Sequence, residues 1–122
     1  MNYTIEVKRN ITKGTGTLKF KNGSVSVNTK CWFELENPIP AKKYIGCSAT
    51  HMRTKKNSQD KKREGIYIPD KQTNRRGIFI HMGTNASWSE GCIVIKEKEM
   101  LKVWNAIHPK DGGNVTVIVK NI

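Results

Sequence analysis

The sequence lacks the features that define membrane, secreted and disordered chains. No apolar stretch approaches the roughly 20 residues needed to cross a bilayer. Residues 1–6 show no basic segment followed by an apolar run of about 7 to 15 residues, so no secretory signal is visible. With only 4 Pro and 10 Gly, the composition is neither collagen-like nor disordered. Its 122 residues predict a single domain, 1–122, that is made in the cytoplasm and has no membrane span.

Acidic residues are scarce, with 10 Asp and Glu against 22 Lys and Arg, which gives a net charge of +12. Such a surface attracts polyanions in a salt-dependent way. The charge alone does not distinguish nucleic acid, anionic lipid and acidic envelope polymers from a surface that is simply solvated. No nucleic-acid recognition motif is present, and aromatic residues do not alternate with the basic run at 53–63, so no specific nucleic-acid partner is expected.

Metal and phosphate motifs are also missing. The three cysteines contain no Cys-x-x-Cys pair, and His51 and His108 have no partners at metal-ligand spacing. Residues 14–16, Gly-Thr-Gly, lack the Gly-Lys-Ser/Thr of a phosphate loop. We therefore expect neither a metal nor another cofactor.

The hydrophobic pattern predicts a mainly β fold of the β-rich α+β kind, built from antiparallel sheets or a sandwich. Asn22-Gly23 predicts a tight hairpin with both turn residues at positive φ. A second hairpin is expected between 31–35 and 43–47, around a loop that contains two prolines. Arg53–Arg63 is expected to be a mobile exposed loop. The pattern predicts one helix, at 96–107, and further strands at 65–69, 77–81, 92–95 and 114–119.

The stretch from Ile80 to Ile95 has the composition of a thiol nucleophile site. An imidazole such as His81 can take the proton of a thiol such as Cys92 and then hold the thiolate by ion pairing. Gly91 would let a substrate approach the backbone, where N–H groups can face a developing oxyanion. Ser89 could orient the imidazole or line the pocket. The alternative is a buried structural cysteine and a histidine with ordinary hydrogen bonds.

Two other observations concern neighbouring residues. Glu90, between Ser89 and Gly91, is expected to be exposed rather than to accept a proton. Cys31 and Cys47 lie at equal distances from Ile39 in the sequence, so a hairpin closing there would allow a disulfide; two buried thiols are the favoured alternative.

The segment His81-x-Gly83 followed by Ser89-Glu90-Gly91-Cys92 resembles the motif of the L,D-transpeptidase (YkuD-like) catalytic domain. The resemblance implies a β-rich fold in which Cys92 attacks a peptide carbonyl of a peptidoglycan stem peptide. His81 would act as the base, and the acyl group would pass to an amine or to water.

Residues 33–36 and 39–44, Phe-Glu-Leu-Glu and Ile-Pro-Ala-Lys-Lys-Tyr, are similar to a pattern of small relatives in phages and among secreted interbacterial effectors. The resemblance implies substrate contacts from Gly83 and Tyr44. Trp88, in the site loop, could stack on sugar or stem peptide and contact substrate, but the favoured alternative is that it pins its loop to the body. Typical transpeptidases carry Arg two residues after the cysteine, where this sequence has Val94, which favours cleavage or exchange over cross-linking.

The resemblance implies an antibacterial effector or phage lytic protein that acts in the periplasm or cell wall of a target or host bacterium. Its partners would be the stem peptide and an immunity protein, or secretion or phage machinery. The alternatives are a catalytically degenerate wall-binding domain and a basic nucleic-acid-binding module.

Overall fold

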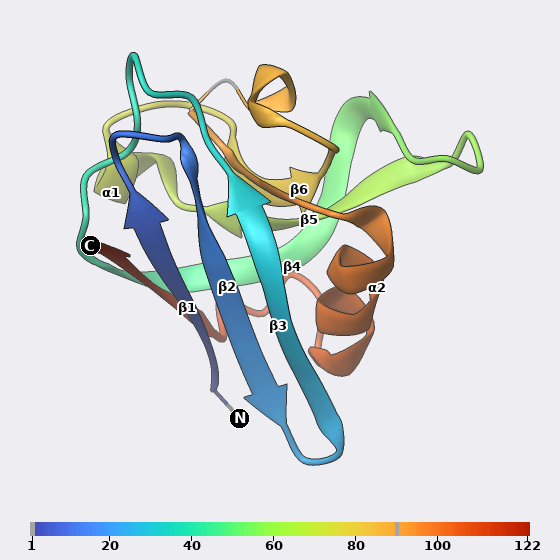
Figure 1. Ribbon diagram of the computed structural model, residues 1–122. Helices are drawn as coiled ribbons and strands as arrows, with labels where there is room; N and C mark the ends of the chain where they lie inside the picture. Colours follow the sequence, from blue (N-terminus) through green and yellow to red (C-terminus); the bar gives the residue numbers. More distant parts are fainter. Residues whose placement is uncertain (1, 90) are drawn as a thin grey trace.

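The protein is a closed β-barrel with short helices outside it (Figure 1). The computed structural model describes residues 2–89 and 91–122. Within these residues, the elements in chain order are β1 (Tyr3–Asn10), β2 (Thr15–Asn22), β3 (Val25–Trp32), β4 (Lys43–Lys56), β5 (Lys62–Ile68), α1 (Asp70–Thr73), β6 (Ile78–Met82), the 3-10 helix η1 (Ala86–Trp88), β7 (Ile93–Ile95), α2 (Glu97–Ala106) and β8 (Val115–Asn121).

The strand order around the barrel is β1-β2-β3-β7-β6-β5-β4-β8. The pairs β1–β8 and β6–β7 are parallel, and the other neighbours are antiparallel. The expected mainly β class with one helix in the C-terminal half is confirmed. The β1–β8 pair closes the barrel and joins segments far apart in the sequence. The β6–β7 pair joins two strands separated by a loop and completes the site.

Alternation of side chains produces the barrel core. In β1, buried residues alternate with exposed or half-buried ones along the whole strand, as expected for a sheet with one face inward. The central strands β6 and β7 carry Ile78, Ile80, Ile93 and Ile95, all at most 1% exposed. Because β-branched side chains pack well on a pleated surface, these two short strands form a rigid platform.

Two expected turns differ in the structure. The β2–β3 turn consists of Gly23 and Ser24, because Asn22 pairs with Val25; only Gly23 has positive φ, at 59°. The hairpin expected between 31–35 and 43–47 does not form, since β3 pairs with β2 and β7, and β4 pairs with β5 and β8. The connection 33–42, whose prolines cannot donate ladder hydrogen bonds, carries the chain to another part of the barrel.

Cys31 and Cys47 are two buried thiols on non-adjacent strands, and they are not linked by a disulfide. Burial raises the pKa of each thiol to about 12. This confirms the buried-thiol alternative.

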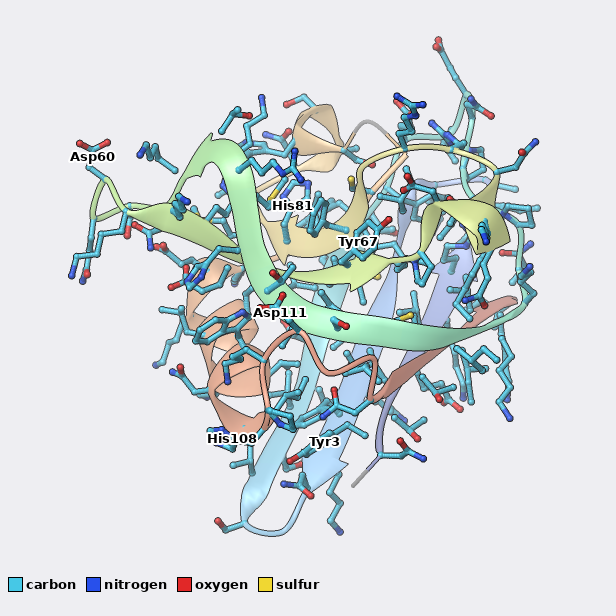
Figure 2. All side chains as sticks on the ribbon, turned by 180° about the vertical axis from the view of Figure 1, so that it is seen from behind. Tyr3, Asp60, Tyr67, His81, His108 and Asp111 are labelled. Carbon is cyan, nitrogen blue, oxygen red and sulfur yellow. The ribbon has the colours of Figure 1, made fainter. Side chains whose placement is uncertain are left out.

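The basic segment expected as a mobile loop is instead a long hairpin made by the ends of β4 and β5. Its turn is held by Asn57, whose side-chain oxygen accepts hydrogen bonds from the N–H groups of Gln59 (2.9 Å) and Lys61 (3.1 Å). Asp60 takes a positive φ of 61° within this turn. Figure 2 shows Asp60 at the tip of the hairpin, which projects away from the barrel. Local turn chemistry therefore orders a segment that has no apolar anchor.

Helix α2 covers the barrel beside β3, β5 and β6 and agrees closely with the expected range. Met100 and Val103 face the core, and the Trp104 Nε1–H donates to the Thr50 carbonyl oxygen at 2.8 Å. The one-turn helix α1 was not expected from the sequence, because four residues are too few to show helical periodicity.

A buried arginine is the most unusual feature of the core. Arg9 is 2% exposed, and burial lowers its pKa. Its Nε–H donates to the Asn121 side-chain oxygen at 3.1 Å, and its guanidinium carbon lies 5.1 Å from the centre of the Phe33 ring. The Nη1 atom makes no hydrogen bond within the described part of the chain. A desolvated cation with incomplete hydrogen bonding is destabilising.

We expect Arg9→Met to raise the free energy of unfolding by about 1 kcal/mol, because a buried charge is replaced by an apolar side chain of similar length. Urea denaturation measures the change, with Arg53→Met on the exposed end of β4 as the control. A loss of stability in Arg9→Met greater than in the control would contradict this account.

Candidate active site

The parallel pairing of β6 with β7 brings His81 and Cys92 together. Ile80 lies opposite Ile93 and His81 opposite Val94, so Cys92 comes just before the paired residues of β7. Side chains alternate along each strand, so Cys92 points to the same face as Val94 and therefore as His81. The two side chains are diagonal neighbours, and both line one hollow. Figure 2 shows His81 on β6 in the body of the molecule.

The Cys92 side chain, 5% exposed, is held between two backbone groups that precede and begin β6. The Phe79 N–H donates to Sγ at 3.4 Å, and the thiol donates to the Gly77 carbonyl oxygen at 3.6 Å. An N–H directed at sulfur stabilises the thiolate, whereas the carbonyl acceptor is matched to the protonated thiol. The sulfur is thus positioned by the same strand that carries His81.

The His81 ring has a defined tautomer. Its Nδ1 lies 2.8 Å from the carbonyl oxygen of Met82. A carbonyl only accepts, so Nδ1 carries a proton, and in the neutral ring Nε2 then carries the lone pair. An imidazole in this form can accept a proton at Nε2 while its orientation is held from the other side.

Ser89 forms hydrogen bonds with the backbone on both sides of the nucleophile turn. Its hydroxyl donates to the Cys92 carbonyl oxygen and accepts from the Glu34 N–H at 3.3 Å. The side chain is 4% exposed. Ser89 thus joins the loop 33–42 to the turn that carries Cys92, and the expectation that it orients the imidazole or lines the pocket stays a prediction.

Gly91 and Gly83 are required for close packing. Gly91 has φ of +88°, and a Cβ there would lie 2.4 Å from Nη2 of Arg75. Arg75 in turn donates to the Asn37 carbonyl oxygen at 2.5 Å and lies 3.7 Å from the Glu34 carboxylate. A Cβ at Gly83 would lie 2.4 Å from Val94 and 2.8 Å from Trp88. Gly83 therefore leaves room for Trp88 to pack against it, and the expected substrate contact of Gly83 stays a prediction.

Trp88 and Tyr44 differ in their exposure to solvent. Trp88 is 38% exposed, packs its base on Gly83 and lines the hollow. Tyr44 is fully buried, and its hydroxyl donates to the Pro40 carbonyl oxygen. The expectation that Tyr44 contacts substrate is therefore corrected, because its ring has no exposed surface to offer.

The hollow beside Cys92 has a volume of about 370 Å³. Basic side chains that sequence reasoning did not assign to the site form much of its wall: Lys55, Arg63 and Arg76. A second hollow of about 640 Å³ shares Met52, Lys55 and Gly77 with it. The two hollows therefore adjoin each other at β4. The folded hairpin places Lys55 and Arg63 beside the thiol, and the loop before β6 adds Arg76.

Glu90, which was expected to be exposed, lies outside the residues that the structure describes. Across 2–89 and 91–122, no three His, Cys, Asp or Glu side chains are grouped so that they could hold a metal ion. The same ranges contain no helix that is both long and apolar enough to span a bilayer.

The model of the YkuD family, the L,D-transpeptidase catalytic domain, matches residues 9–119. The chain therefore belongs to the YkuD L,D-transpeptidase catalytic domain family. A search of curated proteins gives no match.

Solved structures share the fold at low sequence identity. An L,D-transpeptidase from Mycobacterium smegmatis has a TM-score of 0.55 and 11% identity, covering 97% of this chain and 59% of its own. Bd1075 from Bdellovibrio bacteriovorus has a TM-score of 0.56 and 17% identity, covering 98% and 47%. The helical cell shape determining protein Pgp2 from Campylobacter jejuni has a TM-score of 0.53 and 14% identity, covering 98% and 48%. The chain thus spans about half the length of these proteins.

Removal of the Ser89 hydroxyl is expected to loosen the nucleophile turn. Ser89→Ala leaves two buried backbone groups without their partner, which costs about 1–3 kcal/mol of unfolding free energy. Urea denaturation measures the loss, with Ser87→Ala, an exposed hydroxyl in the same loop, as the matched control. Equal stability of the two variants would contradict the role assigned to Ser89.

Alkylation should distinguish the three thiols. At pH 8, a pKa of about 12 leaves Cys31 and Cys47 almost entirely protonated, and burial excludes the reagent. We expect iodoacetamide to label folded protein once, at Cys92, and denatured protein three times, as read by peptide mass spectrometry. Labelling of Cys31 or Cys47 at the rate of Cys92 in folded protein would contradict this reading.

Proposed function

We propose that this domain is a cysteine enzyme that acts on peptidoglycan stem peptides. Membership of the L,D-transpeptidase catalytic domain family supports the substrate class and the thiol chemistry. The observation that carries the proposal is that Cys92 and His81 line one hollow, with Nδ1 of His81 committed to the Met82 carbonyl oxygen. The base thus lies on β6, and the nucleophile is the residue directly before the adjacent strand β7.

The proposed reaction has two steps. His81 Nε2 takes the proton of Cys92 as Sγ attacks the peptide carbonyl, and the imidazolium then gives that proton to the departing amine. The product is a thioester between Cys92 and the acyl part of the stem peptide. Water or an amine attacks the thioester, His81 takes a proton from the attacking group, and the thiol is restored. Hydrolysis gives carboxypeptidase or endopeptidase activity, whereas an amine acceptor gives exchange or transpeptidation.

We place cleavage or exchange ahead of wall synthesis. Val94 stands where typical transpeptidases carry arginine, and it is fully buried beside Gly83 and Trp88 on the face that carries His81 and Cys92. The similarity of residues 33–36 and 39–44 to small phage and effector relatives supports an antibacterial or lytic role in the periplasm or cell wall. A net charge of +12 would favour association with acidic envelope polymers. Such a protein would require an immunity protein, or secretion or phage machinery, as a partner.

Digestion of purified sacculi tests the proposal. Wild type should release altered muropeptides detectable by mass spectrometry, and Cys92→Ala should lower the rate by at least about a thousandfold, because the covalent step is lost. Cys31→Ala, which removes a buried thiol elsewhere in the barrel, should keep the activity per folded molecule.

Circular dichroism of each variant separates loss of catalysis from loss of fold. Full activity of folded Cys92→Ala would overturn the mechanism. Binding of sacculi without cleavage by wild type would instead indicate a degenerate wall-binding domain.

A further inference from the structure

The outer part of the β4–β5 hairpin has no third strand beside it. Strand β5 pairs with β6 over residues 65–68, and within the described part of the chain the β4 residues after Cys47 pair with β5 alone. A two-stranded ribbon without a further strand is marginally stable by itself. Contacts with other elements must therefore fix the direction in which this hairpin points.

The direction of the hairpin matters because two of its cations reach the thiol. Lys55 on β4 and Arg63 on β5 form part of the wall of the hollow beside Cys92. None of the described lining residues of this hollow is acidic. A recess with low-dielectric walls and one sign of charge attracts ions of the opposite sign. The position of the hairpin therefore contributes to the electrostatic potential at the thiol.

Glu97, the first residue of α2, contacts the hairpin near its tip. Its Oε2 accepts a hydrogen bond from the Ser58 N–H at 3.0 Å, and hydrogen bonding to Ser58 is the main reason that the pKa of Glu97 is lowered. An ionised acceptor makes this a charge-assisted hydrogen bond. Helix α2 packs on the barrel through Met100 and Val103, and Figure 1 shows its start on the same side of the molecule as the hairpin. Glu97 thus joins the hairpin to a fixed element.

Arg63 extends the same connection to the site. Its Nε–H donates to the Lys56 carbonyl oxygen across the hairpin at 2.8 Å. Its guanidinium carbon lies 5.1 Å from the centre of the Trp88 ring, within range of a cation–π contact. The charge of the Glu97 carboxylate partly offsets the lowering of the Arg63 pKa by burial. Glu97 therefore acts on the hairpin turn through a hydrogen bond and on β5 through its charge.

We infer that Glu97 is a positioning residue: by holding the turn of the hairpin against the start of α2, it keeps Lys55 and Arg63 on the wall of the hollow beside Cys92. Glu97 is not among the residues that line this hollow, so it acts through the hairpin and touches no reacting atom. Its effect on turnover rests on the proposed function, whereas its effect on the surroundings of the thiol does not. Without its acceptor oxygens, the hairpin should move away and the positive potential at the thiol should fall.

Two substitutions separate the hydrogen bond of Glu97 from its charge. Glu97→Gln removes the charge and keeps a carbonyl oxygen that can accept from the Ser58 N–H, whereas Glu97→Ala removes both. Glu99→Ala is the matched control, because Glu99 lies in the same first turn of α2 and pairs with Lys102 on the same helix. The probe is the ratio of Cys92 alkylation rates with iodoacetate and iodoacetamide, two reagents of similar size and different charge. Each rate is divided by that of free cysteine.

At low ionic strength, wild type, Glu97→Gln and Glu99→Ala should show an iodoacetate-to-iodoacetamide ratio at least about threefold higher than Glu97→Ala, because anions are attracted to the hairpin cations. Loss of a negative charge alone would raise the ratio, so a fall confined to Glu97→Ala reports the position of the hairpin. Hydrogen exchange of the Ser58 amide should be at least about tenfold faster in Glu97→Ala than in wild type, since its acceptor is lost.

An unchanged alkylation ratio or an unchanged Ser58 exchange rate in Glu97→Ala would overturn the inference. An equal fall of the ratio in Glu97→Gln or in Glu99→Ala would overturn it as well, because the hydrogen bond would then not be the cause. These measurements need no turnover, so they decide the inference even if wild type fails to cleave sacculi, a result that would reject the proposed function alone. With a cleaved soluble muropeptide, Glu97→Ala should raise KM more than it lowers kcat, and Glu97→Gln should restore KM. An unchanged KM in Glu97→Ala would overturn the effect on turnover.

Discussion

The parallel pairing of β6 and β7 is the constraint on which the site depends. It joins two short, largely buried strands, with His81 near the end of β6 and Cys92 just before β7, and it sets which face these two residues share. A shift of one residue would send one of the two side chains to the opposite face, because side chains alternate along a strand. The isoleucines of the two strands resist such a shift, since it would exchange core and exterior positions.

The ten-residue connection between the two strands is held by close packing. Gly83 admits Trp88 against Val94, Gly91 admits the Arg75 guanidinium, and the Ser89 hydroxyl joins Cys92 to the backbone of Glu34. These three contacts hold the turn in place. Residues that a motif comparison would assign to catalysis or substrate binding thus hold the backbone that presents the thiol. The small residues of a motif can therefore be needed to shape the backbone around the nucleophile.

The long β4–β5 hairpin gives this site its own electrostatic character. Asn57 and Asp60 form its turn, and Arg63 contacts Trp88 on the η1 loop. Positive charge that looks like a solvated run in the sequence is therefore concentrated at the mouth of the thiol hollow. The other basic residues of the segment 53–63 are exposed, where they contribute to association with polyanions at long range.

Local patterns were enough to predict the mainly β class, helix α2 and the strands that carry His81 and lead from Cys92, because alternation and helical periodicity depend on neighbouring residues. The Cys–His motif likewise indicated the family to which the chain belongs. Tertiary structure decided which strands pair, and this separated Cys31 from Cys47, buried Tyr44 and turned the segment 53–63 into a wall of the site. Those outcomes depend on barrel closure, which joins residues distant in the chain through packing that no local pattern encodes.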